Sequence, residues 1–434
     1  MKHPKQPLRT PLQEEVFTLS ERIVEAQRPI RVLDALKWDA EIRDKFLAKK
    51  GKELPQITHE YYQQKPLSFD PELKKQEFYA IERDIRKKLG QYTGAGTIME
   101  RMCREYREVV RMLEARGSEE FSLISQELYG SAQDAFYAGA PTLKDLGTLL
   151  ATTLPELKKS AANCDEEKIY TGAEAVVLLG KQLAGYFNEH DGQVRVKVSD
   201  DIIADASAGA ECIKIRQDAH FSKRDLRVLE VHEGWVHLGT TLNGLAQPIC
   251  TFLSKGPPSS TITQEGLAII TEIFTFSSFP DRVQRLTNRV TAIAMAEDGA
   301  DFIDIFKFFK EYGADDTVAY SAAARVFRGS LPNGKPFTKD LVYSKGFILI
   351  YNYIRLAVQR GLLSRIPLLF VGKTTLEDLH LLEDLVEEGL VSLPRYLPPQ
   401  FRDLSALSAW MCYSLFLNKL NLEQLSVNYK NFLE

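Results

Sequence analysis

His232-Glu233-Gly234-Trp235-Val236-His237 is the stretch that decides how this chain is interpreted. It places two imidazoles and one carboxylate within a segment whose pattern is typical of a helix. Neutral imidazole is the commonest protein ligand for zinc, and a neighbouring carboxylate can take a proton from water on the metal. The motif therefore predicts a catalytic zinc site in which Glu233 is the general base.

The two histidines are one residue further apart than in the zinc-protease motif H-E-x-x-H. In an α-helix, residues four apart are offset by roughly 40°, whereas residues five apart are offset by roughly 140°. A regular helix would therefore direct His232 and His237 to different faces, and the glutamate beside them would be unrelated. A π-bulge absorbs the extra residue, and such bulges occur mostly at functional sites. We expect a π-bulge here, eased by the flexible backbone of Gly234.

A third ligand is needed, because catalytic zinc keeps three protein ligands. Gln264-Glu265-Gly266-Leu267-Ala268 begins an apolar helix, and Thr261 with Gln264 forms a capping-box pattern at its start. Glu265 and Glu272 are seven residues apart and share a face of this helix. A carboxylate on so apolar a helix is costly unless it is paired or bound to a metal. We predict Glu265 as the third ligand; the alternative is a first-turn glutamate stabilised by the helix dipole.

Strands are expected just before the histidine motif. Residues 193–198 and 212–216 alternate apolar and polar side chains, which is typical of half-buried strands. The small residues 204–210 between them favour a turn or a close approach to substrate. Ser222 and Asp225 form a capping box that begins a helix, which we expect to continue through the motif to about Leu238.

The first part of the chain predicts helices almost throughout. Thr10-Pro11-Leu12-Gln13 is a capping box with proline at the first helical position. Further helices are expected from Asp70-Pro71 to Gly90, over 97–116 and over 165–190. The fold class is therefore α/β and mostly helical, with a small sheet beside the active-site helix. We expect an N-terminal helical region, residues 1–165, and a catalytic domain, residues 166–434.

Composition excludes several classes of protein. The 434 residues are 44% hydrophobic and 26% charged, and the net charge of −4 argues against a nucleic-acid partner. The apolar run 347–353 is too short to cross a membrane, and the N-terminus does not read as a signal peptide. The five cysteines include no C-x-x-C pair, which favours reduced thiols. We therefore expect a cytoplasmic protein with neither nucleic-acid nor membrane partners.

The split motif followed by Gln264-Glu265-Gly266-Leu267-Ala268 resembles the QEGLA-motif family, which includes the microtubule-associated tyrosine carboxypeptidases. Other members are known by an association with flavohaemoglobin expression. The resemblance extends to residues 31–38, 243–244, 325–329 and 337–343, and covers most of the chain. It implies a gluzincin-type zinc metallopeptidase core with His232, His237 and Glu265 as zinc ligands and Glu233 as base and later acid.

Eukaryotic relatives in this family remove a C-terminal tyrosine from tubulin. The resemblance therefore implies a carboxypeptidase that releases a C-terminal residue, tyrosine by analogy, from a peptide or protein. This chain lacks a long basic leader, which argues against microtubules as its substrate. Two alternatives are a zinc-containing regulatory or binding protein without turnover and a hydrolase of non-peptide amides. The sequence does not specify an oligomeric state.

A carboxypeptidase must also bind a free α-carboxylate and stabilise an oxyanion. Arg325, Arg328 and Lys339 are close in sequence and are candidates for the carboxylate, since a guanidinium binds a carboxylate through two hydrogen bonds. The alternative for each is a solvated surface charge. Tyr343 is a candidate donor to the oxyanion, and its alternative role is packing in the core.

Overall fold

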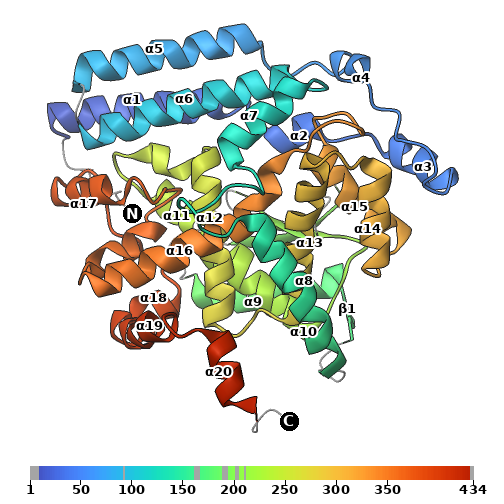
Figure 1. Ribbon diagram of the computed structural model, residues 1–434. Helices are drawn as coiled ribbons and strands as arrows, with labels where there is room; N and C mark the ends of the chain where they lie inside the picture. The colour runs from blue at the N-terminus through green and yellow to red at the C-terminus, as the bar shows by residue number, and fades with distance from the viewer. Residues whose placement is uncertain are drawn as a thin grey trace.

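The computed structural model describes residues 9–90, 93–160, 167–187, 194–200, 205–209 and 212–430, with the side chains of 158–160 left aside. The described chain is mostly helical and contains two small sheets (Figure 1). Among the described helices, none is both long and apolar enough to cross a membrane.

Helices α1 (Pro11–Gln27), α5 (Pro71–Leu89) and α6 (Gly94–Glu114) pack side by side along one edge of the molecule (Figure 1). The predicted capping box of α1 is confirmed, because the Thr10 side chain accepts from the Gln13 amide and the Gln13 side chain accepts from the Thr10 amide. The predicted helix over 97–116 begins earlier, at Gly94, because the Thr93 hydroxyl accepts from the Gly96 amide. The neighbouring helices are α2 (Val32–Leu36), α3 (Ala40–Ala48), α4 (His59–Gln63) and α7 (Glu119–Tyr129).

Helices α12 (Pro258–Phe274) and α16 (Val342–Gln359) cross at the centre of the fold with their backbones in contact. A Cβ atom on Gly266 would lie 2.3 Å from the carbonyl oxygen of Gly346, so both crossing positions require glycine. The capping box predicted at Thr261 is wrong, since α12 already begins at Pro258, where proline suits the first turn. The Ser259 amide is bound instead by the Glu105 carboxylate of α6, at 2.9 Å.

A three-stranded sheet has the order β2 (Arg195–Ser199), β4 (Cys212–Arg216), β3 (Ala206–Ala208). The two predicted strands are confirmed, although Gln193 lies outside the described residues. They pair in parallel, with Arg195 opposite Cys212. The turn predicted over 204–210 is replaced at its centre by β3, which pairs antiparallel with β4, and residues 204 and 210 lie outside the described residues.

The second sheet joins β1 (Tyr170–Thr171) to β5 (His220–Phe221) in antiparallel pairing. Helix α9 (Gly172–Tyr186) follows β1 and begins at a capping box made by Thr171 and Glu174. The helix predicted over 165–190 is therefore confirmed in part and is shorter, because this cap fixes its start after the strand. Residues 165–166 and 188–190 lie outside the described residues.

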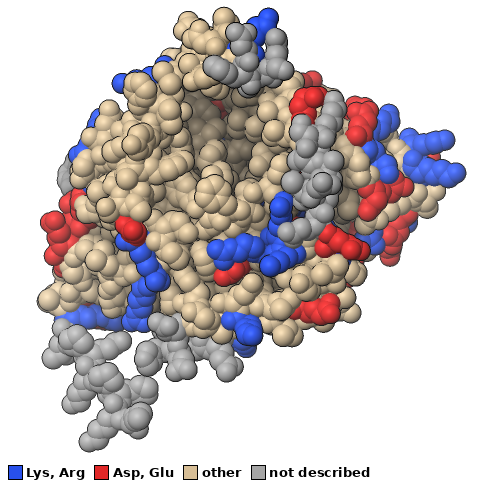
Figure 2. All heavy atoms as spheres, turned by 90° about the horizontal axis from the view of Figure 1, so that it is seen from below, with Lys and Arg blue, Asp and Glu red and all other residues tan. Residues whose placement is uncertain are grey.

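The other described elements surround these. They are α8 (Leu143–Ser160), α13 (Pro280–Glu297), α14 (Phe302–Glu311), α15 (Asp316–Phe327), α17 (Leu379–Glu387), α18 (Pro399–Arg402), α19 (Leu404–Leu417) and α20 (Leu422–Asn428), with the 3₁₀ turns η2 (Thr251–Ser254), η3 (Thr338–Leu341), η4 (Leu363–Arg365) and η5 (Pro367–Phe370). Figure 2 shows one face of the molecule, which carries a hollow walled mainly by residues that are neither basic nor acidic.

Hydrophobic cores connect these layers. One core contains buried side chains of the N-terminal helices, such as Leu19 and Met99, together with Leu267 of α12 and Ile350 of α16. A separate core packs α9 and the three-stranded sheet against the helix that carries the histidine motif. The first core thus contains side chains from both sides of residue 165, where the sequence placed a domain boundary. The boundary itself stays a prediction.

Candidate metal centre

The histidine motif lies on a π-helix. Helix α10 (Lys223–Leu229) begins at the predicted Ser222 capping box and continues into a π-helix, η1 (Glu230–Leu238), and then into α11 (Gly239–Leu245). The sequence predicted a single π-bulge in a helix ending near Leu238; the structure instead has nine π-helical residues, and the helix continues to Leu245. Hydrogen bonding from i to i+5 returns His237 to the face of His232. Their ring centroids are 4.7 Å apart.

Gly234 lies within the π-helix and faces α9. A Cβ atom at this position would lie 2.3 Å from Cδ2 of Leu183. The sequence suggested that glycine eases the distorted backbone. The structure adds a packing reason, because the absence of a side chain allows α9 to approach the back of the π-helix.

His232, His237 and Glu265 place three potential ligand atoms together. Glu265 Oε2 lies 3.3 Å from His232 Nε2 and 3.4 Å from His237 Nε2, and all three atoms lie within 4.8 Å of one another. Ligand atoms in a tetrahedral zinc site, each roughly 2.0–2.1 Å from the ion, are about 3.3–3.4 Å apart. Glu265 Oε2 is also buried without a hydrogen-bond partner among the described residues. The three side chains therefore fit a divalent cation.

A second carboxylate orients His232 from behind. Glu272 lies seven residues after Glu265, on the same face of α12. Its Oε1 atom is 2.6 Å from His232 Nδ1. Arg282 of α13 donates two hydrogen bonds to the Glu272 carboxylate, at 2.9 and 3.2 Å. A carboxylate that binds the outer nitrogen of a ligating histidine fixes its tautomer and ring orientation. Glu272 and Arg282 therefore present Nε2 of His232 towards His237 and Glu265.

The electrostatics of this group are strongly coupled. Burial opposes charge on His232, yet the neighbouring carboxylates of Glu265 and Glu272 raise its pKa to about 9. Burial likewise opposes charge on Glu265 and Glu272, but nearby positive groups lower both carboxyl pKa values, that of Glu272 to about 2. In the absence of a metal, the centre thus holds its carboxylates ionised and a proton on His232. A bound cation would replace that proton.

Glu233 is close enough for its charge to act on His232, and it is held by the small sheet. The backbone amide of Ala208 in β3 donates to Glu233 Oε2 at 2.8 Å. One carboxylate oxygen is therefore fixed by β3, and the other remains available to a reacting group. The close approach of residues 204–210 to substrate stays a prediction, and in the structure Ala208 of this segment contacts Glu233.

A cluster of basic residues surrounds Asp340; we call it the basic cluster. Arg325 donates two hydrogen bonds to Asp340, at 2.7 and 2.9 Å. Arg328 approaches the same carboxylate only to 3.9 Å, and its Nε is buried without a hydrogen-bond partner among the described residues. Lys339 and Arg289 complete the cluster, and all four cations feel the charge of Asp340. Positive charge therefore exceeds negative charge here.

Burial lowers the pKa of three of the four cations in the basic cluster, whereas the charge of Asp340 outweighs burial at Arg325 and raises its pKa. Burial, reinforced by the charge of Arg325, lowers the pKa of Arg328 to about 10. Burial also lowers the pKa of Lys339 and that of Arg289. An anion that entered the cluster would reverse these shifts, because an opposite charge favours the charged form of each cation. The basic cluster is thus suited to bind an anion.

Tyr343 connects the two groups. Its ring centroid lies 6.4 Å from that of His232, and the Arg289 guanidinium carbon lies 4.8 Å from the centre of the Tyr343 ring. Burial and the negative charge of Glu265 raise the pKa of the Tyr343 phenol. The phenol therefore keeps its proton at neutral pH and can donate a hydrogen bond.

The structure brings together the side chains that the sequence singled out, in two adjacent groups. Sequence reasoning missed the roles of several further residues. These are Glu272, Arg282, Arg289 and Asp340. One signal was available in the sequence, because Arg282 and Arg289 are seven residues apart and so share a face of α13.

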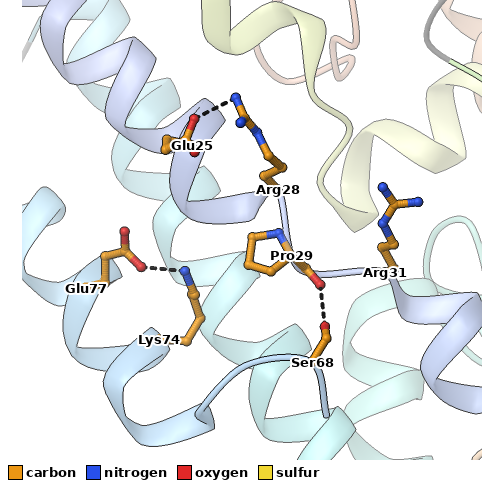
Figure 3. Close-up of a pocket in the computed structure, with 7 residues that line it drawn as sticks. All are labelled: Glu25, Arg28, Pro29, Arg31, Ser68, Lys74 and Glu77. Atoms are coloured by element: carbon orange, nitrogen blue, oxygen red, sulfur yellow. Dashed lines mark hydrogen bonds and ion pairs between the residues drawn. The ribbon is translucent and has the colours of Figure 1, made fainter.

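A pocket elsewhere on the surface has less chemical content (Figure 3). It lies between α1 and α5, where Arg28 pairs with Glu25 at 2.7 Å and Lys74 pairs with Glu77 at 2.5 Å. Both carboxylates thus already have cationic partners, and the residues that line the pocket include neither histidine nor cysteine. The histidine motif and the basic cluster are therefore the better candidate site.

Comparison with known proteins gives one family match. Residues 44–419 match the model of a family described as microtubule-associated tyrosine carboxypeptidase. No curated protein matches the chain. Among solved structures, the chain resembles one described as a putative lipoprotein from Colwellia psychrerythraea, with 12% identity and a TM-score of 0.39, over 94% of this chain and 77% of that one. A TM-score this low does not assign a fold to the chain.

Proposed function

The chain belongs to the microtubule-associated tyrosine carboxypeptidase family, and from this premise we propose that it is a zinc-dependent carboxypeptidase with a gluzincin-type core. The family supplies the reaction class, which is removal of a C-terminal residue from a protein. One observation supports the metal dependence above all others. Glu265 Oε2 is buried without a hydrogen-bond partner among the described residues, between the Nε2 atoms of His232 and His237.

In this proposal His232, His237 and Glu265 hold the metal, and Glu272 with Arg282 keeps His232 in place. Two histidines and one glutamate form the ligand set of a catalytic zinc site with one open position. When bound, zinc would make water nucleophilic near neutral pH and polarise the scissile carbonyl. The remaining chemistry belongs to the side chains around it.

Glu233 is proposed as the general base and later the general acid. The Ala208 amide holds one of its oxygens, so the carboxylate has a fixed direction when it takes a proton from the attacking water. The same carboxyl group then gives the proton to the departing amine. Tyr343 is proposed to donate its phenolic hydrogen to the developing oxyanion, which requires the protonated phenol that its raised pKa favours.

The basic cluster is proposed to bind the α-carboxylate of the substrate. Arg325 is already engaged by Asp340 through two hydrogen bonds, which leaves Arg328, Lys339 and Arg289 with unbalanced charge. A guanidinium pairs with a carboxylate through two parallel hydrogen bonds, and such charge-assisted pairs are strong. Arg325 would then act through Asp340, by fixing the position of the cluster.

A metal analysis combined with a peptide panel tests this function. We expect the purified protein to contain zinc in a one-to-one ratio, and the His232→Ala variant to contain none. The panel consists of peptides that differ only in the last residue, together with the same peptides amidated at the C-terminus. Release of single residues from the free peptides alone would agree with the proposal.

Other results would overturn it. A folded protein without bound zinc, even after incubation with the metal, would exclude the metal centre. Binding of the free peptides without release of a residue would instead identify a zinc-containing binding protein. Equal cleavage of free and amidated peptides would exclude recognition of the α-carboxylate by the basic cluster.

A further inference from the structure

Lys373 sits behind the metal centre and takes no part in the chemistry proposed above. It follows the 3₁₀ turn η5 and lies on the side of the π-helix where α12 passes. Its ammonium group donates three hydrogen bonds, to the His237 carbonyl at 3.0 Å, the Thr240 hydroxyl at 3.0 Å and the Gln264 side-chain oxygen at 2.9 Å. All three donors of the ammonium are thus in use.

The partners of Lys373 belong to the two helices that carry the candidate ligands. The His237 carbonyl is part of a ligand residue on the π-helix, and Gln264 immediately precedes Glu265 on α12. Thr240 closes the network, since its hydroxyl lies 2.7 Å from the same Gln264 oxygen. The ammonium group therefore connects the two helices at the residues next to the ligand atoms.

The backbone of Lys373 is fixed as well. Its amide donates to the Leu253 carbonyl at 2.7 Å. The preceding residue must be glycine, because a Cβ atom on Gly372 would lie 2.5 Å from that same oxygen. The lysine thus extends from an anchored turn, and its reach to the two helices is set by the fold.

We infer that Lys373 is a positioning residue of the metal centre, which holds His237 and Glu265 at the separation that a cation requires. That separation is 3.4 Å between His237 Nε2 and Glu265 Oε2. The inference rests on the proposed function in one respect, namely that the three ligand residues bind a metal. It concerns residues that touch neither the metal nor the substrate.

The zinc affinity of metal-free protein tests this inference. Lys373→Met keeps the length of the side chain and removes its three donors. We expect the variant to bind zinc about 10–100-fold more weakly in competition with a chelator, the range found when partners of metal ligands are removed. Gln264→Met removes the acceptor on α12 and should weaken zinc binding in the same direction. The double variant should lose little more than either single variant, because both act on one network.

Asn243→Ala is the matched control. Asn243 also tethers the histidine-bearing helix to the segment after α16, since its side chain donates to the carbonyls of Phe370 and Tyr396 at 2.7 and 2.8 Å. It touches no ligand residue. The control should lower the melting temperature of the metal-free protein while its zinc affinity stays that of the wild type.

The outcomes separate the inference from the proposed function. Wild-type protein that binds no zinc overturns the proposed function and this inference with it. Zinc affinity unchanged in both Lys373→Met and Gln264→Met overturns the inference alone. The same holds if Asn243→Ala weakens zinc binding as much as Lys373→Met does, because the effect would then follow general stability.

Discussion

The candidate metal centre and the basic cluster are neighbours that differ in how their charges are balanced. In the metal centre, Arg282 balances the charge of Glu272, and Glu272 in turn binds His232. In the basic cluster a single carboxylate, that of Asp340, is the counter-charge for four cations. The Nε atom of Arg328 is buried without a hydrogen-bond partner among the described residues. Under the proposed function, the first region holds an ion permanently.

Under the proposed function, the second region binds an anion that arrives with the substrate and leaves with the product. Burying an unpaired guanidinium is costly, so a cluster with excess positive charge is stabilised when an anion binds. The balanced region can maintain its geometry without substrate, whereas the unbalanced region gains most from substrate. Variants that alter one region and leave the other intact test this difference.

The largest effect is expected from Glu233→Gln. The variant retains the ligand residues and a side-chain oxygen for the Ala208 amide, but it loses the group that accepts a proton. We expect kcat to fall by about 10²–10⁴-fold, the usual contribution of a general base, with zinc content unchanged. Peptide hydrolysis and metal analysis of the same preparation measure both quantities.

Glu230→Gln is the control for this variant. Glu230 lies on the same π-helix, but its carboxylate pairs with Arg227 at 2.7 Å and does not contact the ligand residues. Its kcat should match that of the wild type. Full activity of Glu233→Gln would remove Glu233 from the mechanism.

Asp340→Asn should break the basic cluster itself. Removing one partner of a buried ion pair costs about 3–5 kcal/mol of unfolding free energy. Burial opposes the charge of Asp340, but Arg325, Arg289 and Arg328 hold its pKa below the usual range. A depressed pKa stabilises the fold above the unfolded-state value of about 3.9, and this contribution is lost as the pH falls towards the folded-state pKa. Urea unfolding at pH 7 and pH 3 should therefore show a larger difference from wild type at pH 7.

Asp378→Asn should show the opposite trend with pH. Burial raises the pKa of Asp378, so its stabilising contribution is present at low pH and declines as the pH rises through about 4. The same slope for both variants would contradict the assignment of Asp340 as the counter-charge of the basic cluster.

Glu272→Gln tests the balanced region. The amide oxygen of glutamine can still accept a hydrogen bond from His232 Nδ1, but without the charged partner His232 is held less firmly and loses part of its basicity. We expect zinc affinity to fall about 10–100-fold, measured by chelator competition. Glu297→Gln is the control, because this carboxylate is bound by Gln126, Ser131 and the Ala132 amide at a distance from the ligands. Equal loss of zinc in both variants would refute a specific role for Glu272.

Arg328→Met should produce the smallest effect, since Lys339 and Arg289 remain in the cluster. We expect kcat/KM for free peptides to fall about tenfold, as for the loss of a single hydrogen bond to a charged group. Residual cleavage of amidated peptides, and the zinc content, should not change. Arg365→Met, which removes a pair with Glu383 at 2.7 Å, should leave kcat/KM at the wild-type value. A drop confined to zinc content would place Arg328 with the metal centre instead.

Much of the helix that carries the histidines could be predicted from local sequence. The capping box at Ser222 fixed its start, and the five-residue spacing from His232 to His237 indicated a π-helical turn. The length of the π-helix and the packing of α9 against Gly234 were not predicted, because local sequence records neither. The start of α12 was also wrong, since the Glu105 carboxylate of a distant helix binds its first turn.

The residues of the candidate site also fall into those that local sequence could predict and those that it could not. Side chains close in sequence, or one helical repeat apart, were found as candidates from their spacing alone. Arg289 and Asp340 were not, because their importance arises from contacts between α13, α15 and η3 that no local pattern records. Metal binding by His232, His237 and Glu265 stays a prediction, as do the roles of Glu233 and Tyr343.

The contact between Gly266 and Gly346 has a consequence for the fluctuations of the molecule. Backbone amides exchange their hydrogen with solvent only when the local structure opens, and opening is rarest where buried helices are most tightly packed. The turn that carries Glu265 cannot open unless α12 separates from α16, because their main chains touch there. Slow hydrogen exchange of the amides in this turn would therefore persist without metal. The backbone that carries Glu265 would thus be rigid before the ion binds.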